Sequence, residues 1–436
     1  MTKLEAGRPG QPRASGNGPW GAWRVVFMFG LVSLAADMVY EGARSLYGPL
    51  LATLGASALV VGAATGAGEA MALVLRLVFG PLADRSGQYW GLTIAGYGLT
   101  IISVPLLAVT PFIGGAGLAV AIVLILLERS GKAIRSPSKS ALLAHVAGAV
   151  GRGRGFGLHK AMDQTGAFAG PLLVAAIVAT AGGIWAGMLA LAVPGLLAMI
   201  LLLVIRARVP DPSVYDGSAA SGPGPGPAST PQARARGWLA DAVGVGLPRE
   251  FFLYAVAASL TTGGLLTFGI ISYHLTVAGL APVATVPVIY AGAMLAEAVA
   301  AILVGWLYDR VSTKVLYAVP LLVALVPGLA LAQRLWVVLV GVVVWGFAFG
   351  LQDSTIKALV ADLVDASRRA TAYGVFAAIQ GVTAIAGGAL AGWLYEQSVR
   401  SLVWVVALSQ LVALVLLAFT LVGLPRRRRS AEGSAG

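Results

Sequence analysis

Long apolar runs separated by short polar segments dominate this chain. Most runs reach about 20 residues, the length that an α-helix needs to cross the hydrocarbon core of a bilayer. Gly, Pro or charged residues bound each run. The pattern predicts an all-α membrane protein with twelve transmembrane helices, over residues 22–46, 56–80, 89–110, 115–136, 155–180, 183–206, 250–277, 282–307, 315–333, 336–361, 371–396 and 399–424.

Composition agrees with this pattern. Of the 436 residues, 58% are hydrophobic and only 11% are charged, whereas an ordinary soluble domain carries roughly 25% charged residues. The mean hydropathy is +0.86. These values exclude a soluble enzyme. The chain has no cysteine, which excludes a disulfide framework, thiolate catalysis and a Cys-ligated metal. We therefore expect no enzyme activity, no cofactor and no resident metal.

The basic residues are distributed unevenly across the predicted membrane. Of the 30 Lys and Arg residues, 21 lie in loops and tails on one side, while only Arg334 and Arg400 lie in loops on the other. Because cytoplasmic loops carry the excess of Lys and Arg, this distribution predicts that both termini lie in the cytoplasm, in the cell (inner) membrane. The net charge of +12 is then a property of topology, and no nucleic-acid partner is expected.

Polar segments divide the chain into two halves. Residues 1–21 are rich in Gly and Pro without a compact apolar core, so they predict a disordered cytoplasmic tail instead of a signal peptide. Residues 207–249 predict a flexible cytoplasmic linker with a Gly-Pro repeat at its centre. Two six-helix bundles are expected on either side, over 22–206 and 250–424, followed by a basic cytoplasmic tail over 425–436.

The two halves resemble each other in sequence. With an offset of 217 residues, Arg152 aligns with Arg369 and Gly170 with Gly387. With an offset of 225 residues, Gly80-Pro-Leu-Ala-Asp84-Arg85 aligns with Gly305-Trp-Leu-Tyr-Asp309-Arg310. One insertion or deletion of eight residues accounts for both registers. Such parallel repeats are typical of transporters and predict two pseudo-symmetric bundles.

These motifs resemble the major facilitator superfamily over essentially the whole chain. The Gly80 to Arg85 segment is similar to the loop signature that follows helix 2 in that family, although Gln88 and Tyr89 stand where basic residues are usual. The resemblance implies alternating access between two six-helix bundles. It assigns a cytoplasmic gate to the two copies of the motif, namely Gly80, Asp84, Arg85, Gly305, Asp309 and Arg310.

Two further motifs point to a branch of that family. The helix-4 segment around Glu128 and Arg129 partly resembles a motif whose intramembrane Arg is linked to proton coupling. Gly166-Ala-Phe-Ala-Gly170-Pro171 is similar to a helix-5 motif of proton-driven exporters, in which small residues allow close packing and Pro bends the helix. The longer stretch from Gly131 to Asp163 resembles a prokaryotic branch of proton-coupled exporters and permeases.

Charged residues inside the predicted spans concentrate in the first half. Each ionised side chain at a helix centre costs about 2.5–3.5 kcal/mol, so each needs a partner or water. We expect Asp37, Glu41 and Glu69 to face a central cavity, where one of them loads a proton, with Arg129 or Arg44 responding to it. Structural ion pairing is the alternative. The residues predicted to couple protons or line the cavity are Asp37, Glu41, Arg44, Glu69, Arg76, Arg129, Lys132, His159 and Asp163.

The second half offers fewer polar groups within its spans. Glu297 stands alone in a long apolar run, where it either binds a polar cargo or sits protonated against a neighbouring helix. Asp353 and Lys357 have the four-residue spacing of an intrahelical pair. The residues predicted to line the substrate cavity are Tyr40, Tyr273, His274, Glu297 and Gln380.

The sequence therefore predicts a secondary transporter that uses alternating access, because this function accounts for duplicated gate motifs around a charged cavity. We expect a monomer that exports a small amphiphilic organic compound or drug in exchange for protons. A divalent metal exporter, for which Asp37, Glu41, His159 and Asp163 supply oxygen and nitrogen ligands, stays open. So do a proton-coupled uptake symporter and a non-transporting scaffold.

Overall fold

The computed structural model describes residues 20–215, 247–364 and 368–433. Within these ranges the chain is almost wholly helical and has no strand. The first half contains α1 (Ala22–Thr53), α2 (Ala58–Ser86), α3 (Tyr89–Leu106), α4 (Gly117–Val150), α5 (Arg152–Ala181), α6 (Ile184–Ala190) and α7 (Ala192–Arg208). The second contains α9 (Arg249–Gly264), α10 (Phe268–Val277), α11 (Val286–Val311), α12 (Ala318–Ala330), α13 (Leu335–Leu363), α14 (Arg369–Gln397) and α15 (Val399–Gly433).

Short 3-10 helices join several of these helices. They are Leu107–Phe112 and Gly114–Ala116 between α3 and α4, Pro212–Tyr215 after α7, Val283–Thr285 before α11, and Ser312–Tyr317 before α12.

Each predicted span coincides with a helix or a pair of consecutive helices. Eleven of them, counted over the described residues, are long and apolar enough to cross a membrane. The span predicted on α4 is absent from that set. The helix carries Glu128, Arg129, Lys132 and Arg135 within two turns, so its polar face lowers its hydropathy. Its count as a twelfth membrane span stays a prediction.

Two predicted spans are interrupted. The helix expected over 250–277 breaks after Gly264 and resumes at Phe268, and the helix expected over 183–206 is split into α6 and α7 at Leu191. The prediction of one continuous helix over 250–277 was therefore wrong. The two leucines at the break, Leu265 and Leu266, continue the apolar run, but Thr262-Gly263-Gly264 directly before them is a signal for a helix break.

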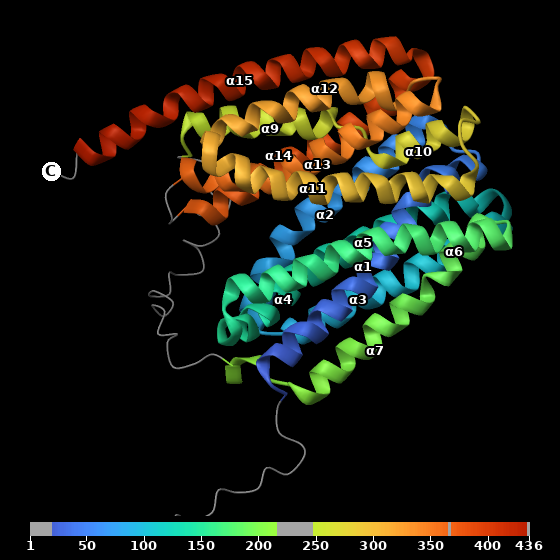
Figure 1. The fold of residues 1–436 in the computed structure, drawn as a ribbon, viewed down its shortest axis with the longest axis horizontal. Coiled ribbons are helices and arrows are strands. Elements are labelled where there is room, and N and C mark those ends of the chain that lie inside the picture. Colours follow the sequence, from blue (N-terminus) through green and yellow to red (C-terminus); the bar gives the residue numbers. More distant parts are fainter. Residues whose placement is uncertain (1–19, 216–246, 365–367, 434–436) are drawn as a thin grey trace, which may run out of the picture.

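The helices form two bundles that follow the chain halves (Figure 1). One bundle holds α1 to α7 and the other α9 to α15. α2 runs between them and packs along α14, while α1 contacts α10 and α5 contacts α11. The first residues of α1 and α9 and the last residues of α7 and α15 lie at the same end of the molecule (Figure 1). We call this end the linker end and the opposite end the far end.

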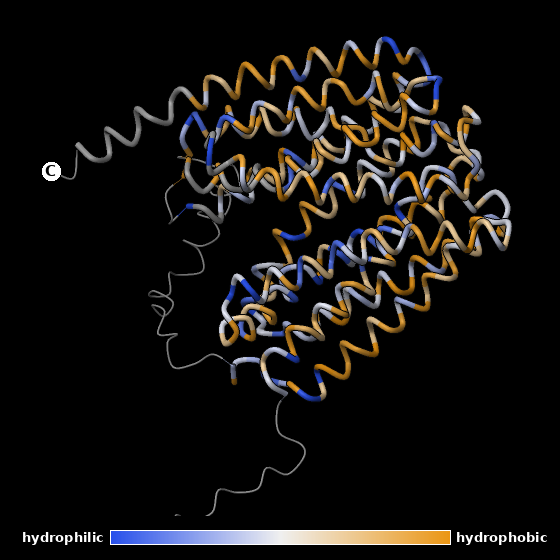
Figure 2. Tube along the Cα trace, in the orientation of Figure 1, coloured by the Kyte–Doolittle hydropathy of each residue, from blue (hydrophilic) through white to orange (hydrophobic). Residues whose placement is uncertain are grey.

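Apolar side chains cover the outside of both bundles. Figure 2 shows apolar residues along the outward side of α7 and the described part of α15, with hydrophilic residues between the bundles and at the helix ends. Large exposed side chains such as Val193, Ile302 and Phe419 lie on this surface. An apolar exterior with a polar interior is the arrangement that a lipid solvent requires.

The sequence repeat has a structural counterpart. A Cβ atom added to Gly170 of α5 would lie 2.3 Å from the carbonyl oxygen of Met38 in α1. A Cβ atom added to Gly387, the aligned residue in α14, would lie 2.1 Å from the carbonyl oxygen of Gly263 in α9. In each bundle, a glycine therefore lets a later helix approach the backbone of the first helix closely.

The bundles meet tightly toward the far end. A Cβ atom on Gly62 of α2 would lie 2.1 Å from the carbonyl oxygen of Gly388 in α14, and one on Gly392 would lie 2.1 Å from that of Ala58. The amide of Leu59 donates a hydrogen bond of 2.9 Å to Glu396 Oε1. These backbone contacts close the far end.

The predicted N-terminal tail and most of the predicted linker lie outside the described residues, which omit 1–19 and 216–246. Most of the predicted C-terminal tail continues α15, which ends at Gly433. The start of the predicted linker packs on the first bundle. Trp90 Nε1 donates a hydrogen bond of 3.0 Å to the carbonyl of Pro210, and the Tyr215 hydroxyl donates one to the carbonyl of Trp20.

Candidate functional site

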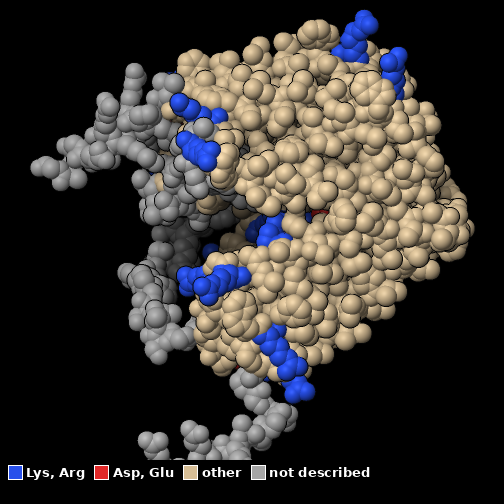
Figure 3. Space-filling model, viewed as in Figure 1, with Lys and Arg blue, Asp and Glu red and all other residues tan. Residues whose placement is uncertain are grey.

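A cavity of about 350 Å³ lies between the two bundles. Figure 3 shows the molecule hollowed there, on the side of the linker end, with Lys and Arg side chains at its mouth. Helices of both bundles line it. A cavity at a bundle interface that is sealed at one end and hollowed at the other can hold a ligand and exchange it with one side only.

Ionised side chains dominate the wall that the first bundle supplies. Across the whole cavity, six acidic and six basic residues line the space, so its formal charges balance. Seven of the nine residues predicted for proton coupling are among them. The charged lining consists of Asp37, Glu41, Glu69, Asp163, Glu297, Asp353, Arg44, Arg76, Lys132, Arg135, Lys139 and Lys160.

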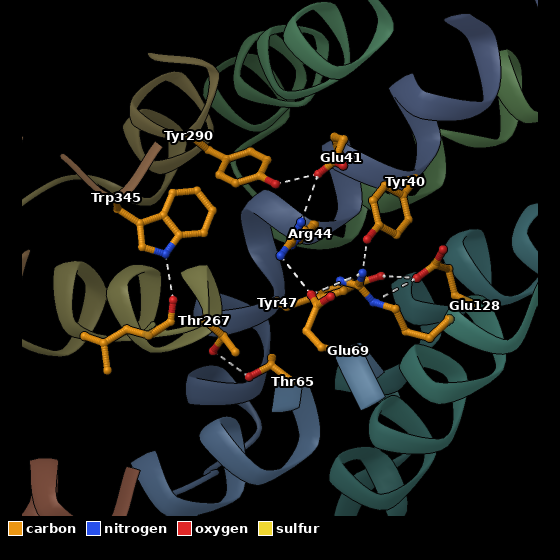
Figure 4. Close-up of polar contacts among 12 residues, drawn as sticks. Tyr40, Glu41, Arg44, Tyr47, Thr65, Glu69, Glu128, Thr267, Tyr290 and Trp345 are labelled. Atoms are coloured by element: carbon orange, nitrogen blue, oxygen red, sulfur yellow. Dashed lines mark hydrogen bonds and ion pairs between the residues drawn. The ribbon is translucent and has the colours of Figure 1, made fainter. Parts of the chain in front are cut away.

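A chain of ion pairs joins α1, α2 and α4 (Figure 4). Arg44 Nη2 lies 2.8 Å from Glu69 Oε1, and Arg44 Nη1 lies 3.7 Å from Glu41 Oε2. Arg129 Nη1 lies 3.4 Å from the same Glu69 oxygen, and its Nε lies 3.5 Å from Glu128 Oε2. Arg129 is 2% exposed and Glu128 is fully buried. Because removal of any member leaves a buried charge without its partner, the network holds three helices in one arrangement.

Tyrosine hydroxyls complete this network. Arg129 donates a hydrogen bond to the Tyr40 hydroxyl, and the Tyr47 hydroxyl donates one of 3.3 Å to Glu128. Lys132 lies 3.3 Å from the centre of the Tyr40 ring. Sequence analysis did not select Tyr47. Its spacing of seven residues from Tyr40 puts both on one face of α1, and that signal could have identified it.

One contact of the network crosses between the bundles. The Tyr290 hydroxyl of α11 donates a hydrogen bond of 2.5 Å to Glu41 Oε2 of α1. Tyr290 is fully buried. Nothing in the sequence pairs these residues, since they are 249 positions apart.

Two carboxyl groups meet on the cavity wall between α1 and α5. Asp37 and Asp163 lie within electrostatic range of each other. Asp163 also accepts a hydrogen bond of 2.6 Å from Ser33 and lies 3.4 Å from Lys160 Nζ. Lys139 Nζ donates to the Ser33 hydroxyl at 3.1 Å. Asp163 is therefore surrounded by a hydroxyl donor and a cation, with the Asp37 carboxyl group nearby on the same wall.

The second bundle supplies a mostly apolar wall. Trp345 and Phe349 of α13 stack with ring centres 5.3 Å apart, and Met294 of α11 lies beside the cavity. Gln380 Nε2 donates a hydrogen bond of 2.9 Å to Thr262 Oγ1. Glu297 lines the cavity, and no hydrogen bond or ion pair joins it to a residue that the structure describes.

The break between α9 and α10 also borders the cavity. Trp345 Nε1 donates a hydrogen bond of 2.6 Å to the carbonyl of Leu266 within the break. The hydroxyl groups of Thr267 and Thr65 lie 2.7 Å apart and join α10 to α2 (Figure 4). Irregular backbone inside a membrane persists only where its polar groups find partners or line a cavity. Both conditions hold here.

Comparison with known proteins decides the family. The family description "Major Facilitator Superfamily" matches residues 25–319 and 251–436, which together cover most of the chain. The chain belongs to the Major Facilitator Superfamily. An uncharacterized protein of Mycobacterium tuberculosis is 49% identical over 397 residues, covering 91% of this chain and 92% of that protein. An uncharacterized MFS-type transporter of Methanocaldococcus jannaschii is 25% identical and covers 86% of this chain and 89% of its own length.

Solved structures share the fold at low sequence identity. A nucleoside transporter has a TM-score of 0.70 at 15% identity, covering 91% of this chain and 99% of its own. A peptide transporter in complex with sulfate has a TM-score of 0.70 at 16% identity, covering 95% and 96%. The chain is therefore a multi-pass membrane transporter and not an enzyme, with a small-molecule substrate, as the sequence predicted.

Two residues predicted to line the substrate cavity, Tyr273 and His274, lie outside it in the structure. His274 Nδ1 lies 2.9 Å from the Tyr395 hydroxyl and its Nε2 lies 3.0 Å from the carbonyl of Ala332. Tyr273 packs edge-on against the same Tyr395 ring. Neither lines the cavity, so both predictions were wrong. After the break, α10 packs mainly against α1 of the first bundle, and Tyr273 adjoins the apolar core of that bundle.

Two residues of the predicted coupling group also lie outside the lining. Arg129 sits behind the wall, where it pairs with Glu69 and Glu128. His159 is buried on α5, and its Nδ1 has no hydrogen-bond partner. The four ligands proposed for a divalent metal do not converge. The described residues contain no group of three or more His, Asp or Glu side chains that could hold a metal ion.

The superfamily loop motif is open in this form. Asp84 is exposed and accepts a hydrogen bond of 3.2 Å from the Tyr89 hydroxyl, the residue that replaces a basic one in the motif. Gly80 and Arg85 lie in the last two turns of α2. In the second copy, Arg310 lies 3.6 Å from the centre of the Trp306 ring. The side chains of Gly305, Asp309 and Lys357 lie outside the described residues.

The helix-5 motif packs α5 on α1. A Cβ atom on Gly166 would lie 2.2 Å from the carbonyl oxygen of Leu34, one turn before the contact of Gly170 with Met38. Pro171 is buried beside them. Small residues four apart therefore bring the backbones of these helices together, which holds Asp163 of α5 against Asp37 of α1.

Proposed function

We propose that this chain is a proton-coupled antiporter that exports a small amphiphilic organic compound by alternating access. The placement of Asp37 and Asp163 near each other on the cavity wall carries the proposal. Because two neighbouring carboxylates repel each other, the pair retains one proton on the wall of a cavity that is open at one end. No cofactor is needed, because the proton gradient supplies the free energy.

Alternating access couples this proton to the membrane gradient. The pair lines the cavity, so its proton exchanges with the solution at the linker end in the present form. When the far end opens and the linker end closes, the same pair exchanges with the other solution. A proton loaded on one side is then released on the other.

The two cavity walls support an amphiphilic cargo. The first bundle presents ionised groups, while the second presents Trp345, Phe349 and Met294. A compound with a polar head and an apolar body matches both walls. The helix-5 segment from Gly166 to Pro171, which resembles a motif of proton-driven exporters, supports export over uptake.

Charge supports the proposed orientation. The linker end carries the predicted cytoplasmic flanks, including Arg206, Arg208 and Arg249 at the ends of α7 and α9. By the positive-inside rule, this end faces the cytoplasm of the inner membrane. The present form is then open to the cytoplasm. We further propose that the transporter acts as a monomer, because each chain contains a complete cavity.

A test of coupling needs no knowledge of the cargo. Since the chain has no cysteine, spin labels can be placed with Phe156→Cys and Trp306→Cys across the linker end, and with Leu59→Cys and Glu396→Cys across the far end. Double electron–electron resonance should show that pH changes the ratio of the two forms. Asp37→Asn and Asp163→Asn should each abolish that response.

Asp84→Asn is the matched control, because it neutralises an exposed carboxylate outside the cavity, and it should leave the pH response intact. A response that persists unchanged in both cavity variants would refute the coupling site. Impermeant thiol reagents on Phe156→Cys in sealed vesicles of each orientation test the topology. Labelling only in inverted vesicles is the expected result.

A further inference from the structure

Two cavity residues of opposite charge, Arg76 and Glu297, have no hydrogen-bond or ion-pair partner among the residues that the structure describes. Arg76 of α2 lines the cavity, and its Nε is buried without a hydrogen bond. Glu69 and Asp353 lie within electrostatic range, yet no hydrogen bond or ion pair joins Arg76 to any described residue. Glu297 of α11 is likewise unpaired within the described chain, although Lys160 and Arg44 lie within electrostatic range.

Other charged residues of the cavity lining, unlike Arg76 and Glu297, have partners within the protein. Arg44 and Glu69 pair with each other, and Lys160 pairs with Asp163. Lys139 donates to Ser33, and Lys132 lies on the face of the Tyr40 ring. These groups already hold contacts with their own bundle. Arg76 and Glu297 therefore keep their full hydrogen-bonding capacity for a ligand.

An unpaired ionic group within a membrane protein is costly unless it serves a ligand or water. A guanidinium binds a carboxylate through two parallel hydrogen bonds, and a carboxylate binds an ammonium group. The two free groups lie on helices of different bundles. A ligand that carries both an anionic and a cationic group satisfies both of them.

We propose that the cavity binds a zwitterionic solute of the amino acid or short peptide class, with its carboxylate on Arg76 and its ammonium group on Glu297. The stacked rings of Trp345 and Phe349 receive its apolar or aromatic side chain. This assignment rests on the proposed transport function and specifies its cargo. A solute held from both bundles also draws them together, which favours closure of the linker end.

Matched ligands test the assignment without altering the protein. Isothermal titration calorimetry on the purified chain, at one fixed pH, would compare phenylalanine, N-acetylphenylalanine and phenylalaninamide. The same three forms of alanyl-phenylalanine test the longer class. Each blocked form loses one charge and keeps the aromatic ring. The free zwitterion of at least one length should bind about tenfold or more tightly than both of its blocked forms.

Variants then assign each charge to a residue. Glu297→Gln should weaken zwitterion binding about tenfold and remove the preference over the N-acetyl form, while the preference over the amide persists. Arg76→Gln should also weaken zwitterion binding about tenfold, but it should remove the preference over the amide and keep the preference over the N-acetyl form. Non-additive losses of this kind identify a direct contact. Arg400→Gln, which neutralises an exposed residue at the far end, should leave all affinities unchanged.

Several results would overturn the assignment. They are equal binding of a blocked form and its zwitterion, absence of binding by all six compounds, and retention of both preferences in the variants. The spin-label response to pH is measured without any ligand. If that response persists while the zwitterions fail to bind, the proton-coupled function stands and only this cargo class is wrong.

Discussion

The Tyr290 hydroxyl donates a hydrogen bond of 2.5 Å to Glu41 and thereby joins α11 of the second bundle to α1 of the first. Glu41 also lies 3.7 Å from Arg44, which pairs with Glu69. The contact thus links the second bundle to the whole ionic network of the first. It is buried, so water cannot replace it.

Tyr290→Phe removes this link without changing the ring. A hydrogen bond to a charged group contributes about 1.5–3 kcal/mol, so we expect the ratio of the two forms to shift about 10- to 100-fold away from the present one. The spin-label pair at positions 156 and 306 measures the shift. Tyr317→Phe, on a tyrosine outside the cavity, should have no such effect. An unchanged distance distribution would contradict a role in holding this form.

Glycine packing at the far end should tolerate no side chain. Gly62→Ala and Gly392→Ala each place a Cβ atom 2.1 Å from a carbonyl oxygen of the opposite bundle. We expect overpacking to destabilise the present form by about 1–3 kcal/mol and to lengthen the distance between labels at positions 59 and 396. Gly374→Ala on α14 is the control, because nothing lies within 4 Å of its added Cβ atom. Equal behaviour of the three variants would contradict the prediction.

Arg129 should matter more for stability than for binding, because it lies behind the cavity wall. Arg129→Met leaves Glu128 and Glu69 without their shared cation, and loss of one member of a buried pair costs about 3–5 kcal/mol. Thermal unfolding in detergent should show a clear drop in midpoint. The double variant with Glu128→Gln should recover part of that loss, since it removes the stranded charge. A double variant less stable than the single one would argue against this account.

Trp345 should stabilise the break between α9 and α10. Trp345→Phe keeps an aromatic ring in the cavity but leaves the carbonyl of Leu266 without its donor. An unpaired buried polar group costs about 1–3 kcal/mol, so hydrogen exchange at residues 265–270 should accelerate. Phe349→Leu, which removes the stacked neighbour but no hydrogen bond, should leave that exchange rate nearly unchanged. Protection that is equal in both variants would refute the bond's role.

Several site residues could be predicted because their placement follows from helical geometry alone. Asp37, Glu41 and Arg44 follow one another at steps of four and three residues, so they share one face of α1. An ionic face within an apolar span has to point away from lipid. The same reasoning selected Glu69, Arg76, Lys132 and Asp163, all of which line the cavity.

Other predictions failed or were missing where a contact depends on a second helix. Tyr273 and His274 lie on an apolar span, but both contact Tyr395 of α14 and neither lines the cavity. Tyr290 is a single aromatic residue in an apolar run, and its partner Glu41 lies on another bundle. The pairing of Asp37 with Asp163 depends on the close packing at Gly166 and Gly170, which spacing along one helix does not reveal.

The sequence by itself determined the class of the protein, its approximate helix positions, its duplicated halves and the polar face of each helix. These properties depend on the local balance of apolar and charged residues, which the lipid solvent enforces one helix at a time. Only the tertiary structure decided which end is open, which charges are paired, and that Arg76 and Glu297 have no ion-pair partner within the described part of the chain. Pairing depends on distances between helices far apart in the chain, and packing of the two bundles sets those distances.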